Sequence, residues 1–87
     1  MNILISQFGD ILTSRPAGRE AALVFMAYNK FENNLTLDFS GVKVMTPSWL
    51  SEFVQTLKER NKFNITYLES KNPTVVSSID IIESEIN

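Results

Sequence analysis

The sequence contains neither cysteine nor histidine, and these two absences exclude many functions. Without cysteine the chain forms no disulfide and no thiolate metal site. Without histidine it lacks the commonest zinc ligand, the usual general base and every nucleophile that histidine activates. Catalysis would have to use carboxylates, hydroxyls, lysines or arginines alone. We therefore expect no enzyme, no bound metal and no cofactor.

Long runs of one charge or of apolar residues are also missing. Eight basic and ten acidic residues give a net charge of −2, whereas nucleic-acid-binding proteins usually carry a basic stripe. No apolar run approaches the roughly 18 residues that a membrane span needs, and the first residues lack the basic start of a secretion signal. We expect a cytoplasmic protein that binds neither nucleic acid nor membrane. With 87 residues, 44% of them hydrophobic, it should form a single domain over residues 1–87.

Only three prolines occur, and each follows a residue that caps helices. Ser14, Thr46 and Asn72 stand one or two positions before a proline, and proline is tolerated in the first turn of a helix. The predicted helices run from about Pro16 to Tyr28, Pro47 to Arg60 and Pro73 to Ile86.

Alternating or apolar runs predict the strands, which are Asn2–Phe8, Ile11–Thr13, Leu35–Phe39 continuing through Val42–Met45, and Phe63–Leu68. The turn signal Gly9-Asp10 predicts a hairpin or a bent edge strand at the N-terminus. Helices that alternate with strands imply parallel neighbours and right-handed crossovers. The fold class is α/β, and we expect a mixed four-stranded sheet with about three helices packed on it.

The first predicted helix is apolar on all sides, because Ala21 to Tyr28 contains no charged or strongly polar residue. Such a helix is either buried between layers or exposes a surface that another chain covers. Complete burial is difficult in so small a domain. We therefore favour an interface that includes Leu23 and Met26, contacted by a protein partner or by a second copy in a homodimer.

The stretch from Leu35 to Phe53 reads LTLDFSGVKVMTPSWLSEF. Together with the order of elements, it resembles the STAS fold of anti-sigma factor antagonists. In those antagonists a strand similar to Leu37–Val42 leads to an Asp-Ser-Ser-Gly-Leu-Gly motif at a helix start, and a partner kinase phosphorylates the second serine. Thr46–Ser51 occupies that motif here, and Ser48 falls on the phosphorylated position.

Three residues depart from the antagonist motif, since Thr46, Pro47 and Trp49 replace its aspartate, first serine and first glycine. The segment is more similar to bacterial STAS-like domains of uncharacterised function, which show a Ser-aromatic-x-x-Glu pattern that Ser48, Trp49 and Glu52 fit. The resemblance implies a STAS-like fold and a non-catalytic signalling module. It also implies a protein partner, such as a histidine-kinase-type ATPase.

The residues at the second helix start support a partner-binding surface made by Thr46, Ser48, Trp49 and Glu52. A phosphate on Ser48 would gain from the helix dipole and change the surface charge; alternatively, Ser48 makes only the local hydrogen bonds common in first turns. Trp49 is either an exposed interface anchor or a ring folded onto the sheet edge.

Two charged residues are minor candidates. Asp38 ends a predicted central strand, where ligands gather in open α/β sheets, but a turn role beside Ser40-Gly41 competes with a catalytic or metal role. Arg19 is either part of a solvated first turn or a partner for an acid or phosphate.

The expected function is a regulatory module that binds a partner through the second helix start and the apolar first helix. The alternatives are a structural homodimeric subunit and a small nucleotide-binding domain, although the latter lacks a glycine-rich phosphate loop.

Overall fold

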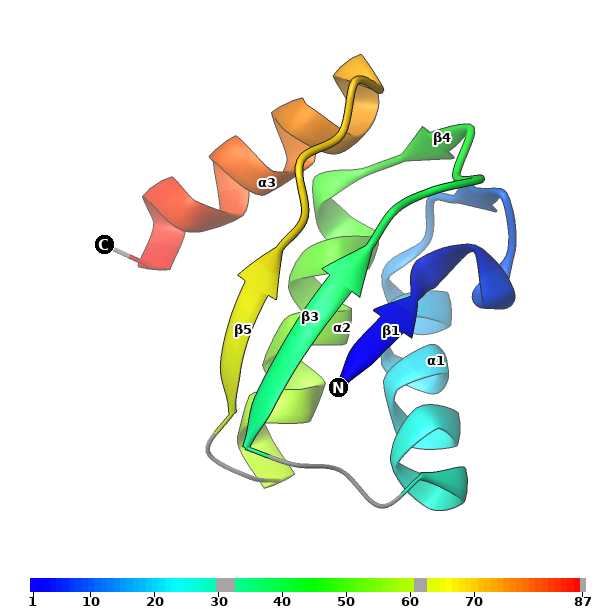
Figure 1. The fold of residues 1–87 in the computed structure, drawn as a ribbon, viewed down its shortest axis with the longest axis vertical. Coiled ribbons are helices and arrows are strands. Elements are labelled where there is room, and N and C mark those ends of the chain that lie inside the picture. The colour runs from blue at the N-terminus through cyan, green and yellow to red at the C-terminus, as the bar shows by residue number, and fades with distance from the viewer. Residues whose placement is uncertain (30–32, 61–62, 87) are drawn as a thin grey trace.

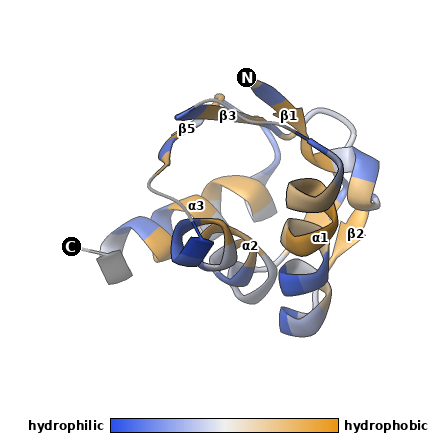
Figure 2. Ribbon diagram, turned by 90° about the horizontal axis from the view of Figure 1, so that it is seen from below, coloured by the Kyte–Doolittle hydropathy of each residue, from blue (hydrophilic) through white to orange (hydrophobic). Residues whose placement is uncertain are grey.

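Three helices cover one face of a three-stranded sheet in a two-layer arrangement, and the opposite face carries none of the described elements (Figures 1 and 2). The computed structural model describes residues 1–29, 33–60 and 63–86. The elements in chain order are β1 (Asn2–Leu4), a 3-10 helix (Ile5–Phe8), β2 (Ile11–Leu12), α1 (Arg15–Tyr28), β3 (Asn34–Asp38), β4 (Val44–Met45), α2 (Pro47–Arg60), β5 (Asn64–Tyr67) and α3 (Pro73–Ile86).

The main sheet has the strand order β1-β3-β5, and both pairs are parallel. Each crossover passes through a helix, α1 between β1 and β3 and α2 between β3 and β5. Right-handed crossovers that advance in one direction place their helices on one face. Leu35 and Leu37 of β3 point to that face and are buried, whereas Thr36 and Asp38 alternate with them on the open face.

The predicted four-stranded mixed sheet is wrong, because the described residues form five strands in two separate parallel sheets. The second sheet pairs β2 with β4. The predicted central strand breaks in two where Asp38 accepts a hydrogen bond from the Ser40 N–H at 3.0 Å and Gly41 adopts φ +86°. That φ favours glycine, and the turn directs the chain away from the main sheet.

Of the two arrangements predicted for the N-terminus, a hairpin or a bent edge strand, the hairpin is wrong. Ile5–Phe8 forms a 3-10 helix rather than continuing the strand, so β1 and β2 lie in different sheets. β2 pairs in parallel with β4 instead, with Ile11 opposite Val44 and Leu12 opposite Met45. Local turn chemistry alone did not indicate this pairing, which joins segments more than thirty residues apart in the chain.

The three predicted helix starts are confirmed. The Ser14 hydroxyl accepts a hydrogen bond from the Ala17 N–H at 3.2 Å. The Thr46 hydroxyl accepts one from the Trp49 N–H at 3.4 Å, and the Asn72 side chain accepts one from the Thr74 N–H at 2.9 Å. Each capping residue satisfies a backbone donor that a helix start otherwise leaves free.

The central helix is α2, which packs against α1 on one side and α3 on the other. Its buried residues therefore extend beyond one stripe, and they are Trp49, Leu50, Ser51, Phe53, Val54, Thr56 and Leu57. The approach of α1 is close at Gly18, where an added Cβ would lie 2.3 Å from the Trp49 carbonyl oxygen. Small residues on α1 thus allow the two backbones to meet.

Candidate functional site

The start of α2 is tied to the loop before α1 by Thr46. Its backbone N–H donates to the Leu12 carbonyl at 3.0 Å, and its hydroxyl donates to the Thr13 carbonyl at 2.9 Å. The same hydroxyl caps α2. Thr46 is half-buried and its polar groups are engaged within the fold, so its position is that of a structural cap beside the predicted partner surface.

The start of α3 is hydrogen-bonded to β4 and to the loop that precedes it. The Asn72 side-chain amide donates to the carbonyls of Val42 and Lys43 at 2.9 and 2.8 Å, and the Met45 N–H donates to the Thr74 hydroxyl at 3.1 Å. All three helix starts therefore meet around β4, at one end of the molecule (Figure 1). Their positive dipole ends favour negative charge there.

Ser48 lies in the first turn of α2 and is half-buried. Within the described part of the chain, its hydroxyl has no hydrogen-bond partner. Ser48 and Glu52 are one turn apart and share a face of the helix. Ser48, which the sequence proposed as a phosphorylation site, therefore has a free hydroxyl in the structure.

Charged side chains of α1 and α2 form an ion-pair strip beside Ser48, and we define this strip as Arg15, Arg19, Glu52 and Glu59. Arg15 lies 3.4 Å from the Glu52 carboxylate, and Arg19 lies 4.0 Å from Glu52 and 3.6 Å from Glu59. The minor candidate Arg19 and the predicted contact residue Glu52 thus pair with each other. Both arginines are largely exposed, so the strip is open to solvent.

The prediction of Trp49 as an exposed anchor is wrong. Its relative exposure is 1%, and its ring stacks on Phe53 with centroids 5.1 Å apart and lies 6.2 Å from the ring of Phe8. The physical reason is that α1 covers the flank of α2 on which Trp49 lies. The alternative prediction, a ring folded onto the sheet edge, is closer to its buried position, although the ring contacts seen are with Phe53 of α2 and with Phe8.

The apolar surface of α1 differs from the predicted one. Met26 is half-buried and packs against the core, and Leu23 is also half-buried. The large apolar side chains that α1 exposes are instead Val24, at 45% exposure, and Tyr28, at 85%. They lie one turn apart on a flank of α1, each three residues after a buried residue, Ala21 or Phe25.

Asp38 holds a turn. Its carboxylate accepts hydrogen bonds from the Ser40 N–H at 3.0 Å and the Ser40 hydroxyl at 2.7 Å. These two bonds stabilise the charged form and lower the pKa of Asp38 below its ordinary value. No group of three metal-ligating side chains is found among the described residues, and Asp38 has the geometry of the turn role.

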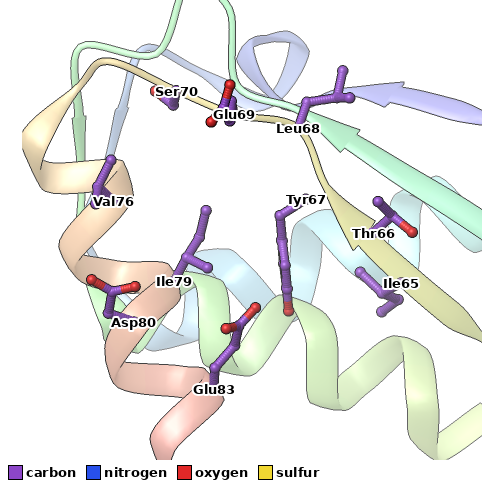
Figure 3. A pocket seen from close by; sticks show the side chains of 10 residues that line it. All are labelled: Ile65, Thr66, Tyr67, Leu68, Glu69, Ser70, Val76, Ile79, Asp80 and Glu83. Atoms are coloured by element: carbon purple, nitrogen blue, oxygen red, sulfur yellow. The ribbon is translucent and has the colours of Figure 1, made fainter.

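A cavity that was not predicted lies between β5 and α3 (Figure 3). Its volume is about 630 Å³, and α3 contributes Val76, Ile79, Asp80 and Glu83 to its lining. The helical spacing of these four residues could be seen in the sequence. The cavity itself could not be predicted, because it forms where α3 packs mainly against α2 and β4 rather than along β5.

The pKa of Tyr67, which lines this cavity, reflects both its burial and a nearby negative charge. Burial of its phenol and, to a lesser extent, repulsion of the phenolate by the nearby Glu83 carboxylate together raise the pKa of Tyr67 to about 12. The Glu83 side chain extends toward the Tyr67 ring (Figure 3). An uncompensated negative charge therefore lies beside an apolar wall.

Comparison with protein families identifies a related family. The family model described as a STAS-like domain of unknown function (DUF4325) matches residues 26–74, which include β3, β4, α2 and β5. No curated protein and no solved structure matches the chain. In the described ranges, none of the helices combines the length and apolar character needed to cross a lipid bilayer.

Proposed function

The chain belongs to the family of STAS-like domains of unknown function, and we propose that it is a non-catalytic regulatory module that binds a partner protein. In this proposal the partner contacts Ser48 and the ion-pair strip on the outer side of α1 and α2. The partner class that we favour is a signalling protein such as a histidine-kinase-type ATPase. Phosphorylation of Ser48 would regulate the contact.

One observation carries this proposal: a free serine hydroxyl lies one helical turn from a carboxylate that is already paired with an arginine of another helix. Surface ion pairs of this kind contribute only about 0–1 kcal/mol, so the Arg15–Glu52 pair can rearrange at little cost. A phosphate adds about 1.5–2 negative charges and three strong acceptor oxygens. It would also gain from the positive end of the α2 dipole.

A phosphorylated Ser48 would therefore compete with Glu52 for Arg15 and Arg19. The phosphate would draw the two arginines away from Glu52, and the start of α2 would then carry both the phosphate and the unpaired Glu52 carboxylate. Acidic groups of a partner that pair with Arg15 and Arg19 in the unmodified protein would be repelled by this added negative charge, and the partner would dissociate. The proposed switch changes the charge of a surface without moving any helix.

The absence of cysteine provides a direct test of the docking surface. Ser48→Cys introduces a unique thiol with nearly the same shape as serine, and a photo-crosslinker attached there should capture a partner in a lysate of the native host. Ser77→Cys is the matched control, because Ser77 is an exposed residue on α3. Capture of the same proteins from positions 48 and 77 would contradict a surface centred on Ser48.

Once a captured partner is identified, binding tests the switch. Ser48→Glu should weaken binding of that partner, whereas Ser77→Glu adds the same charge elsewhere and should not. Mass spectrometry of the protein purified from its host would show whether Ser48 carries phosphate. Equal affinity of Ser48→Glu and the unmodified protein would reject the switch while leaving the docking surface standing.

The exposed pair Val24 and Tyr28 supports a second candidate, a homodimer through the flank of α1 on which both side chains lie. Tyrosine is enriched at protein interfaces, and Val24 extends the exposed apolar surface beside Tyr28. Light scattering should then give twice the monomer mass, and Tyr28→Ser should return the protein to a monomer. A monomeric mass at high protein concentration would exclude this candidate.

A further inference from the structure

The cavity between β5 and α3 is bordered by a strand edge that is not paired in the described part of the chain. β5 pairs only with β3 there. The Asn64 N–H donates to the Asn33 carbonyl at 2.8 Å and the Leu68 N–H donates to the Leu37 carbonyl at 3.0 Å. Because alternate residues of a strand direct their backbone groups to opposite sides, those of Ile65 and Tyr67 point to the free edge.

The cavity wall beside this edge is apolar. Ile65, Tyr67 and Ile79 are half-buried and pack against the core, and all three line the cavity. Figure 3 shows Ile79 of α3 and Tyr67 of β5 facing one another across the space. An added strand would place every second side chain on this wall.

The rim of the cavity is acidic. Glu69, Asp80 and Glu83 line it, and their carboxylates have no ion-pair partner within the described residues. Two of them lie on α3, one turn apart and next to Ile79. A lysine or arginine whose aliphatic stem covers the apolar wall would bring its charged head to these carboxylates.

We propose that the free edge of β5 and this cavity bind an extended segment of a partner protein that carries lysine or arginine at alternate positions. The segment adds to the main sheet as a further strand, so backbone hydrogen bonds to Ile65 and Tyr67 hold it in place. Its inward side chains occupy the cavity, and the acidic rim selects for basic residues among them.

Charge decides between this occupant and a second copy of the chain. Pairing two β5 edges would bring two acidic rims together, and like charges placed across an interface oppose binding. A basic segment neutralises the same carboxylates. The acidic rim therefore acts against edge-to-edge association, a known hazard of exposed strand edges, while it attracts the proposed partner.

The experiment uses a displayed library of random peptides of about seven residues, a length that spans β5 and the extended segment after it. Selected peptides should be rich in lysine or arginine at every second position. Peptide titrations should shift the amide signals of Ile65 and Tyr67 in heteronuclear NMR spectra. Reversing both helix charges, with Asp80→Lys and Glu83→Lys, should raise Kd about tenfold or more.

A matched pair of variants tests the backbone contact. Tyr67→Pro removes the outward N–H, which an edge strand tolerates, and Tyr67→Val removes the ring but keeps that N–H. Peptide binding should fall further in the proline variant than in the valine variant. If the proline variant does not fold, the exposed charge-reversal variants still decide the question, and Ser48→Glu should leave peptide affinity unchanged.

Several results would overturn the proposal. They are a library without enrichment, selected peptides that shift signals near Ser48 instead of β5, and charge reversal without an effect on Kd. A protein that self-associates through β5, and becomes monomeric in Tyr67→Pro, would replace the basic peptide by a second copy.

Discussion

Gly18→Ala tests the close approach of α1 and α2 that positions the candidate surface. The added Cβ would lie 2.3 Å from the Trp49 carbonyl oxygen and 3.2 Å from the Trp49 Cα, and these backbone atoms cannot rotate away. Ordinary contact requires the helices to separate by about 1 Å, which forfeits a quarter to a half of each dispersion contact across the interface.

The expected loss combines two opposing effects. Overpacking of a close contact costs about 1–3 kcal/mol, and the rigid backbone neighbour favours the upper end. Alanine recovers about 1 kcal/mol through its higher helix propensity. The net fall in unfolding free energy is then about 2 kcal/mol, which lowers the Tm by roughly 8–16 °C in a domain of this size.

Urea unfolding followed by the fluorescence of Trp49, the single tryptophan, measures this fall at the contact itself. Far-UV circular dichroism should show that the helices persist. Ala17→Gly on the exposed side of α1 is the control, since it reports helix propensity alone and should cost about 1 kcal/mol or less. An increase in stability of Gly18→Ala would refute the close packing of the two helices.

Three further predictions concern single side chains. The buried Thr56 hydroxyl has no hydrogen-bond partner among the described residues, so Thr56→Val should raise the unfolding free energy by about 1 kcal/mol, measured as a higher urea midpoint with unchanged slope; a lower midpoint would mean that the hydroxyl is satisfied. Trp49→Ala should cost about 3–5 kcal/mol by thermal circular dichroism, whereas a loss below about 0.5 kcal/mol would indicate a surface position. Because the pKa of Tyr67 is raised from 10.0 to about 12, its neutral form contributes stability that is complete below about pH 10 and is lost as the pH rises through about 12. Tyr67→Phe should remove that part of the pH dependence, and an identical stability profile for the two proteins would contradict the assignment.

The sequence was sufficient to predict the helices because their starts carry local signals. Ser14, Thr46 and Asn72 each combine a capping side chain with a following proline, and all three cap helices in the structure. The pairing of short strands was not predicted. β2 and β4 have two residues each, and their partnership depends on tertiary packing that no local pattern encodes.

In the candidate site, too, some features follow from neighbouring residues in the sequence and others depend on tertiary packing. The position of Ser48 in the first turn of α2 follows from Pro47, and the turn role of Asp38 follows from the neighbouring Ser40-Gly41. The burial of Trp49 depends on Gly18, a residue thirty-one positions earlier, which lets α1 cover it. The cavity beside β5 arises from where α3 packs, so its lining could be recognised only in three dimensions.

The hydrogen bonds around β4 join segments that are distant in sequence, since Thr46 bonds to Thr13 and Asn72 bonds to Lys43. A fragment that lacks Thr13 or Asn72 therefore loses hydrogen bonds at the end of the molecule where Ser48 lies. A protein that binds there would distinguish the completely folded chain from truncated or partly folded forms, and its binding would report successful folding as well as any modification.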